Sequence, residues 1–479
     1  MQNKNSNLVK RLGLFTVLAI VVGAVIGSGI FKKPAVMASL LGSPELLIFV
    51  WVLAGVITLF GALSNAEVAS IIPETGGQFI YFKKMYGNLS AYIYGWSILA
   101  VIQTASIASI TYVFAEYTEY FFTLPRFSVE IEQAFRLYMP FVGWIYPLRD
   151  IGVKSLTIFT ILFLSGVNYF GIKYGGIVAD IMTVVKVVAI LILVTFGFIY
   201  SGGSSANFVN DLPQYTGISY STIGAVVLAL SAAFWAYDGW NNITYISGEV
   251  KSPQKNIPIA LIAGTAIVIL VYILINLAYL YVLPINEMAG SKLVAADMAD
   301  RAIGGMGGAI VAALVMISTF GTSNGTIMVS ARVYYSMSKN NMFFKTIGDI
   351  HPKYNTPANA LILQAVWSSV LVFSGSFDDL TDMLIFVSWI FYAFGALGLF
   401  ILRKKMPDTP RPYKVPGYPW VPAIFVIFAF SFVILTLYED INNYMTGKTE
   451  IINSSFGLIL TLVGIPFYYY FKKKYGVKE

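Results

Sequence analysis

The feature that most constrains this chain is a repeated pattern of long apolar segments, each long enough to cross a lipid bilayer. About 20 mainly apolar helical residues cross the roughly 30 Å hydrocarbon core of a membrane. About twelve such segments occur, at residues 13–38, 46–71, 88–121, 151–170, 174–200, 219–247, 257–283, 306–337, 357–375, 380–402, 419–437 and 452–472. Helices satisfy every backbone hydrogen bond within the segment, as a lipid environment requires. The sequence therefore predicts an all-α membrane protein with twelve transmembrane helices.

Composition supports a lipid environment and excludes several classes of protein. The chain is 57% hydrophobic and 11% charged, whereas soluble domains are about 25% charged. It has no cysteine, so disulfides, thiolate metal sites and a disulfide-linked subunit are excluded. The single histidine, His351, lies beside a proline without companion ligands, so we expect a loop residue, no metal and no cofactor. The net charge of +7 is spread between apolar runs, which indicates membrane lipids rather than nucleic acid as the partner.

The distribution of lysine and arginine sets the expected orientation. With both termini on the cytoplasmic side, 20 basic residues fall on cytoplasmic segments and 9 on outer segments. This bias predicts a multi-pass protein of the cell membrane with residues 1–12 as a cytoplasmic tail. The first apolar run is too long for a signal peptide, and we interpret it as the first span. Lys32 and Lys33 run against the charge rule.

Two spans carry interruptions near their centres. The first contains Gly27-Ser28-Gly29, and the sixth contains Asp238-Gly239. Each glycine lowers helix stability by roughly 1 kcal/mol, so both spans are expected to unwind there. An unwound span offers free N–H groups that attract a carboxylate and free C=O groups that attract an ammonium group. The alternative is that these glycines only let helices pack closely.

The position of the two interruptions favours a binding site. They fall in the first span of each of two five-span halves, and paired interruptions of this kind indicate the substrate site of an inverted-repeat transporter. We therefore expect repeats at about 13–200 and 219–402, which together form a transport core at 13–402. Residues 403–479 would hold two further spans and a cytoplasmic C-terminal tail. The halves show no evident sequence repeat, so the repeat is an inference.

Three ionisable residues within spans need an explanation. Lys186 lies near the centre of the fifth span, where a charged lysine costs about 2.5–3.5 kcal/mol, so it must face protein or water. Asp238 lies at the sixth-span interruption, where it could neutralise an ammonium group or cap the outgoing helix; we expect the cap. Glu67, at the end of the second span, is expected to be solvated or salt-bridged rather than to take part in transport.

At these positions the chain resembles the amino acid–polyamine–organocation superfamily, in particular the L-type amino acid transporters and the bacterial serine/threonine exchangers. The resemblance covers nearly the whole chain and rests on several motifs in order. They are Gly27-Ser28-Gly29-Ile30-Phe31, the segment 66–77 (AEVASIIPETGG), the segment 236–241 (AYDGWN), the segment 248–253 (GEVKSP) and the segment 320–325 (FGTSNG). It implies a leucine-transporter-like fold with a five-plus-five inverted repeat and two extra helices.

The resemblance also implies a substrate site at the two interruptions. The residues assigned to it are Val25, Ile26, Gly27, Ser28, Gly29, Ile30, Trp235, Ala236 and Asp238. Amides of Ser28, Gly29 and Ile30 would hold the substrate carboxylate, and a side chain at Gly29 would intrude there. Carbonyls of Val25 and Ile26, with those near Trp235 and Ala236, would hold the amino group. Trp235 would act as an aromatic gate, and the Lys186 ammonium would stand where sodium-coupled relatives bind sodium.

The sequence thus predicts a secondary transporter of neutral L-amino acids that works by alternating access without sodium. Trp235 would shrink the pocket, which favours Ala, Ser or Thr as substrate. A proton-coupled symporter remains an alternative, with Lys186, Asp238 and Glu116 as candidate proton carriers; a polyamine carrier is another. Exchange and uniport remain open. An enzyme would need a metal or nucleophile cluster, and a channel would need a polar pore lining; neither pattern is present.

Overall fold

The computed structural model describes residues 10, 12–171, 175–209 and 220–476. This part of the chain is almost entirely helical. The one sheet in it is a two-stranded antiparallel hairpin of β1 (Leu137–Met139) and β2 (Gly143–Ile145). Among the described residues, ten helical segments are long and apolar enough to cross a membrane, so the protein is a multi-pass membrane protein.

The first half of the chain folds into these helices: α1 Leu14–Val25, α2 Gly29–Leu41, α3 Pro44–Ile71, α4 Gln78–Tyr86, α5 Asn88–Ser97, α6 Gln103–Thr118, α7 Val129–Ala134, α8 Ile151–Tyr169, α9 Gly175–Ile199 and the short η2 Ser205–Phe208. A π-helical turn, η1 Ile98–Ile102, joins α5 to α6, so the third predicted span is continuous from Asn88 to Thr118.

The second half folds into these: α10 Tyr220–Tyr237, η3 Asn242–Glu249, α11 Pro253–Val282, α12 Ile285–Gly290, α13 Val294–Ile303, α14 Gly307–Lys339, η4 Lys345–Gly348, α15 Ala358–Val372, α16 Phe377–Lys405, α17 Trp420–Met445, α18 Asn453–Leu462 and α19 Gly464–Tyr475. The ten long segments match ten of the twelve predicted spans. Two shorter apolar helices, Thr183–Ile199 within α9 and α15, lie where the fifth and ninth spans are predicted.

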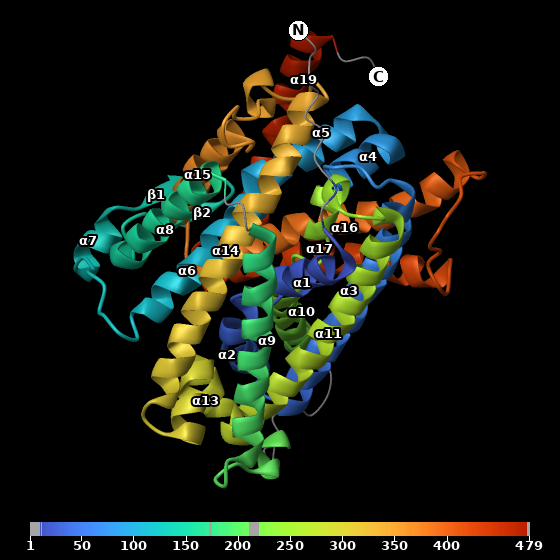
Figure 1. The fold of residues 1–479 in the computed structure, drawn as a ribbon. Helices are drawn as coiled ribbons and strands as arrows, with labels where there is room; N and C mark the ends of the chain where they lie inside the picture. Colours follow the sequence, from blue (N-terminus) through green and yellow to red (C-terminus); the bar gives the residue numbers. More distant parts are fainter. Residues whose placement is uncertain (1–9, 11, 172–174, 210–219, 477–479) are drawn as a thin grey trace.

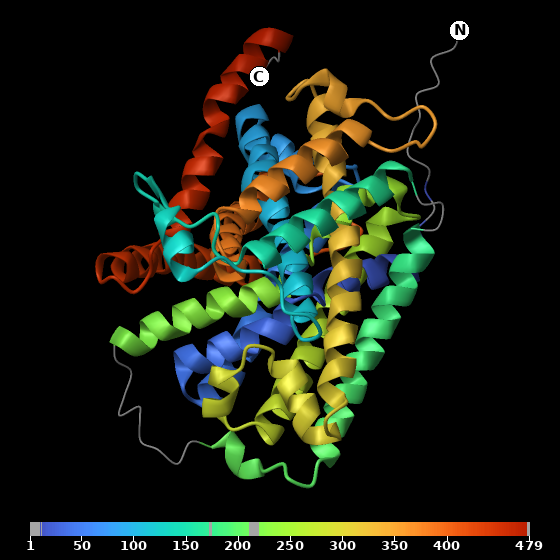
Figure 2. The ribbon, with the colours of Figure 1, turned by 90° about the vertical axis from the view of Figure 1, so that its left-hand side faces the viewer.

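The interrupted spans lie in the middle of the bundle. In Figure 1, α4 and α5 lie at the top and α13 at the bottom, and we call these the α4 end and the α13 end. Helix α1 lies near the centre, and α10 runs inward from the edge of the bundle toward it (Figures 1 and 2). There α1 packs against α9, α11 and α14, while α2 packs against α10, α12 and α13. Both interruptions are therefore enclosed by unbroken helices.

The outer surface of the bundle carries the large apolar side chains that a lipid contact requires. Phe159, Ile192, Leu270 and Ile427 are all exposed on long helices. Soluble monomers rarely expose apolar surface on this scale. Buried polar side chains such as Lys186 and Asn242 lie inside, beside the two interruptions.

The C-terminal end of α3 is fixed by a buried ion pair. The Glu67 carboxylate is fully buried at the end of α3. Arg403 donates to it over 2.9 and 2.7 Å, and the backbone N–H of Val415 donates over 2.8 Å. Arg411 lies 3.3 Å away. The predicted salt-bridge role of Glu67 is confirmed, and it attaches the loop between α16 and α17 to α3.

Candidate functional site

The first span breaks at the predicted glycines. Helix α1 ends at Val25, Ile26 is extended, and α2 starts at Gly29. The Ser28 side chain makes no capping bond to the first turn of α2. The first amides of α2 are thus left without a side-chain cap at the centre of the bundle, as the sequence predicts for an anion-attracting helix end.

The sixth span breaks directly beside the first. Helix α10 ends at Tyr237, and the chain resumes as the 3₁₀ helix η3 at Asn242. Gly239 has φ of +94°, a conformation that disfavours any side chain, and an added Cβ would lie 3.1 Å from the Ala24 carbonyl oxygen. Glycine is required here both for the turn and for the approach to α1.

Gly29 provides the second close approach. A Cβ on Gly29 would lie 2.5 Å from the Cα of Ala236 and 2.7 Å from its Cβ. The sequence predicts that a side chain here would intrude on the substrate carboxylate. In the structure the nearer obstacle is the backbone of the sixth span, because α2 and α10 pack in direct contact.

A small cavity lies between the two breaks. Its walls come from both breaks, from α6 and from α14. They are formed by Ala24, Val25, Gly27, Ser28, Gly29, Ser106, Ile110, Trp235, Asp238, Gly239, Asn242 and Thr326. Of the predicted site residues, Val25, Gly27, Ser28, Gly29, Trp235 and Asp238 line it, whereas Ile26, Ile30 and Ala236 are not among the lining residues.

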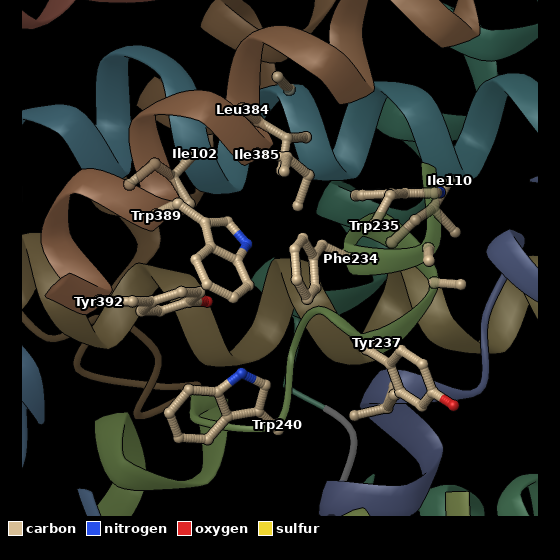
Figure 3. Close-up of a cluster of buried hydrophobic side chains, with 14 of the residues drawn as sticks. Ile102, Ile110, Phe234, Trp235, Tyr237, Trp240, Leu384, Ile385, Trp389 and Tyr392 are labelled. Atoms are coloured by element: carbon tan, nitrogen blue, oxygen red, sulfur yellow. The ribbon is translucent and has the colours of Figure 1, made fainter. Parts of the chain in front are cut away.

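Consecutive aromatic residues at the end of α10 point in opposite directions. Figure 3 shows Phe234 beside Trp389 and Trp235 beside Ile110, which also lines the cavity. The Phe234 and Trp389 rings lie 3.9 Å apart, so Phe234 belongs to the core. Trp235 is buried and packs edge-on against Phe377 of α16, with ring centres 6.1 Å apart. Its position at the cavity wall fits the gate that the resemblance implies.

Asp238 faces the cavity but does not cap the next helix. Its carboxylate accepts a 2.7 Å hydrogen bond from the Tyr392 hydroxyl of α16. The N-cap of η3 is Asn241 instead, so the capping role predicted for Asp238 is wrong. A tertiary donor 154 residues away occupies one carboxylate oxygen, and no local pattern predicts that.

Lys186 points from α9 into the first break. Its ammonium donates to the carbonyl oxygens of Gly23 at 3.0 Å and Ile26 at 2.9 Å, and to the Thr322 hydroxyl at 2.7 Å. All three N–H donors of an ammonium group are thereby used. The prediction that Lys186 faces protein is confirmed. It attaches α9 and α14 to the end of α1.

The family is decided by comparison with known proteins. The family model described as "Amino acid permease" matches residues 12–465. The chain belongs to the amino acid permease family. It is 30% identical to the serine/threonine exchanger SteT of Bacillus subtilis, with 99% of both chains covered. It is 33% identical to the human b(0,+)-type amino acid transporter 1, over 86% of this chain and 80% of the relative. It is also 30% identical to the human cystine/glutamate transporter, over 97% and 85%.

The permease is closed on one side of its cavity by two ion pairs on α2. Lys33 is buried, and its ammonium lies 2.6 Å from Asp378 and 2.8 Å from the Thr381 hydroxyl, both on α16. Lys32 lies 2.9 Å from Glu116 on α6. The two pairs hold α2 against α6 and α16 toward the α13 end.

Toward the α4 end, further cavities adjoin the first. A second cavity shares Ala24, Asn242 and Thr326 with it and reaches Lys186. A third cavity shares Met328 with the second and is lined by Arg332, which lies 3.3 Å from Glu249. These two cavities lie on the α4 side of the breaks, and a further cavity lined by Lys154 and Asp379 lies beside the start of α16.

Sequence reasoning missed the walls that the permease takes from unbroken helices. Ser106 and Ile110 of α6 and Thr326 of α14 line the cavity. One sequence feature points weakly to these walls: residues 103–111 hold several hydroxyl and amide side chains inside an apolar span. Such polar groups in spans tend to face the protein interior, but the spacing alone does not say which of them meets the breaks.

Proposed function

We propose that this permease moves neutral L-amino acids across the cell membrane by alternating access and without sodium. The observation that carries the proposal is the meeting of two helix breaks at one cavity. The amides of Ser28, Gly29 and Ile30 start α2 and suit a carboxylate, while the carbonyls that end α1 and α10 suit an ammonium group. Amino acids are the compounds named for the relatives.

Backbone contacts of this kind recognise the α-carbon groups and leave selection to the side-chain pocket. The cavity is small and Trp235 forms part of its wall. This favours Ala, Ser or Thr as substrate. A polyamine would need several acidic partners, whereas Asp238 is the acidic residue of the cavity wall and is already bonded to Tyr392.

The proposed architecture is a core at 13–402 built from inverted repeats at about 13–200 and 219–402, followed by two further spans. All twelve predicted spans would cross the membrane, with α9 and α15 as the fifth and ninth. The breaks then fall in the first span of each repeat. Both termini would be cytoplasmic, which places the α4 end inside the cell and the α13 end outside.

The absence of sodium coupling is proposed from Lys186. Its ammonium fills the space between the Gly23 and Ile26 carbonyls and the Thr322 hydroxyl. These are oxygen ligands of the type that a hard cation prefers. A fixed positive charge there repels a second cation.

The test is uptake of radiolabelled L-alanine, L-serine and L-threonine into proteoliposomes that hold the purified full chain. We expect saturable uptake with an unchanged initial rate when choline replaces sodium, and no competition by the methyl esters. Uptake that collapses in choline would overturn the role of Lys186. Competition by esters or by simple amines as strong as that by free amino acids would overturn the carboxylate site.

A further inference from the structure

A polar crevice lies beside the start of α16, apart from the substrate cavity. Its walls come from α6, from α8 and the loop before it, from the start of α16, and from the loop between α17 and α18. None of the residues that line the substrate cavity lines this crevice. Both loops lie on the side that the charge bias puts outside the cell. In that orientation a solute in the external medium reaches the crevice without entering the substrate cavity.

Charged residues of both signs line the crevice in equal number. They are Arg149, Lys154 and Lys448, and Asp150, Asp379 and Glu450. The acidic residues already have partners. Asp150 accepts a 2.8 Å hydrogen bond from Arg126, and Glu450 lies 3.1 Å from Arg149. Asp379 accepts hydrogen bonds of 2.8 and 2.7 Å within the capping box that starts α16. Each acidic side chain of the wall is therefore bonded to a group other than Lys154.

Lys154 is a buried charge without a partner of opposite charge. Its side chain is 2% exposed. The ammonium donates to two backbone carbonyl oxygens, that of Tyr146 over 2.9 Å and that of Pro147 over 3.3 Å. Among the described residues no carboxylate forms an ion pair with it. An ammonium group has three donors, so one N–H remains for another acceptor. A buried charge that is held by neutral groups alone gains from an anionic partner.

A second unused donor lines the same crevice. Tyr112 of α6 is 3% exposed. Its hydroxyl has no hydrogen-bond partner in the part of the chain that the structure describes. A buried polar group of this kind is unusual and gains from an added partner. One charged and one neutral donor, from two different helices, suit the two oxygens of a carboxylate. The positive end of the α16 dipole also favours an anion here.

We propose that this crevice is a second binding site of the permease, in which the Lys154 ammonium and the Tyr112 hydroxyl bind a carboxylate group. The site goes beyond the proposed function, because it lies outside the substrate cavity and requires no transport. The carboxylate belongs to a simple organic acid or to an amino acid in the external medium. An amino acid would bring its own ammonium group, and the equal number of acidic and basic residues in the wall would stay balanced.

The experiment measures protection of a cysteine placed in the crevice of the purified full chain. Thr449 lines the crevice and is exposed, and the chain has no native cysteine. The labelling rate of Thr449→Cys by a maleimide is followed while sodium acetate replaces sodium chloride at constant ionic strength. L-alanine and L-alaninamide, which lacks the carboxylate, are added in parallel. We expect acetate and L-alanine to slow labelling in a saturable way, and L-alaninamide to have no such effect.

Two variants in the Thr449→Cys background remove the donors one at a time. Tyr112→Phe loses a hydroxyl that bonds to no described residue, so its folding is not at risk. We expect the half-protecting concentration of acetate to rise about tenfold, as for one lost hydrogen bond to a charged group. Lys154→Met should abolish protection. The matched control is Tyr92→Phe, because Tyr92 of α5 is fully buried and its hydroxyl also lacks a partner. It should leave the half-protecting concentration unchanged.

The relative strength of the two ligands identifies the source of the carboxylate. Equal protection by acetate and L-alanine would support a site for any carboxylate, whereas stronger protection by L-alanine would support a site for amino acids. The proposal is overturned if neither ligand protects, if L-alaninamide protects as well as L-alanine, or if Tyr112→Phe leaves the half-protecting concentration of acetate unchanged. None of these results bears on uptake through the substrate cavity, which the radiolabel experiment tests separately.

Discussion

At the scale of single residues, the shape of the cavity depends on two glycines, because their lack of a side chain lets two backbones come into contact. Gly29 and Gly239 let the two broken spans approach until backbone meets backbone. The carbonyls at the ends of the breaks then come within reach of side chains from unbroken helices, such as Lys186 and Tyr272. A polar site inside a membrane is tolerated where protein groups satisfy the unwound backbone in this way.

This packing predicts a sharp difference between two glycines near the site. In Gly29→Ala the added methyl group would lie 2.5 Å from the Ala236 Cα. Overpacking against backbone costs about 1–3 kcal/mol, so we expect loss of L-alanine uptake and a lower melting temperature in detergent. Gly325→Ala places its methyl group in open space and should retain both. Normal uptake by Gly29→Ala would show that the contact between α2 and α10 is not required.

At the scale of helices, α2 is the element whose position closes the site. Ser376 and Asp379 form a capping box at the start of α16, which fixes Asp378 and Thr381 on the first turns, facing Lys33. Phe377 in the same turn lies 4.7 Å from the Lys33 ammonium and packs on Trp235. The ion pair, the phenyl ring and the indole form one continuous cover toward the α13 end.

Removing the charge of Asp378 should loosen this cover. In Asp378→Asn the buried Lys33 keeps its charge but loses its salt-bridge partner, and breaking a buried pair disfavours the state that contains it. We expect the reactivity of Ser231→Cys, one turn before Trp235, toward an impermeant maleimide added outside cells to rise several-fold.

The control for this effect is Glu450→Gln, which breaks the 3.1 Å pair with Arg149 but does not involve α2. It should leave the labelling rate of Ser231→Cys unchanged. Because the chain has no native cysteine, labelling reports on the introduced thiol alone. Equal labelling rates in the presence and absence of Asp378→Asn would mean that the ion pair does not hold the cover closed.

The particular helices show what a sequence can and cannot predict. Apolar length alone located the spans, and Gly27 and Gly29 located the first break, because both effects are local. Lys33 and Asp378 are 345 residues apart, and their pairing depends on tertiary packing, so the sequence left Lys33 as an exception to the charge rule. Asp238 was assigned to a cap from its local sequence, whereas Tyr392 on a distant helix decides its bonding.

At the scale of the whole molecule, the two sides of the substrate site differ in how open they are. The site adjoins hollow space on the α4 side and is covered on the α13 side. Alternating access requires such asymmetry, with rigid groups of helices moving around a fixed site. With the α4 end in the cytoplasm, this structure corresponds to a state that is closed to the outside.

This assignment of ends can be tested with two single cysteines in intact cells. Gly290→Cys would be exposed beside α13, and Lys353→Cys would be exposed in the loop before α15. The charge bias puts Gly290 outside and Lys353 in the cytoplasm. We expect an impermeant maleimide to label Gly290→Cys in intact cells and Lys353→Cys only after the membrane is permeabilised. The reverse pattern would place both termini outside the cytoplasm and invert the direction in which this state is open, while labelling of both cysteines in intact cells would mean that the count of spans between them is wrong.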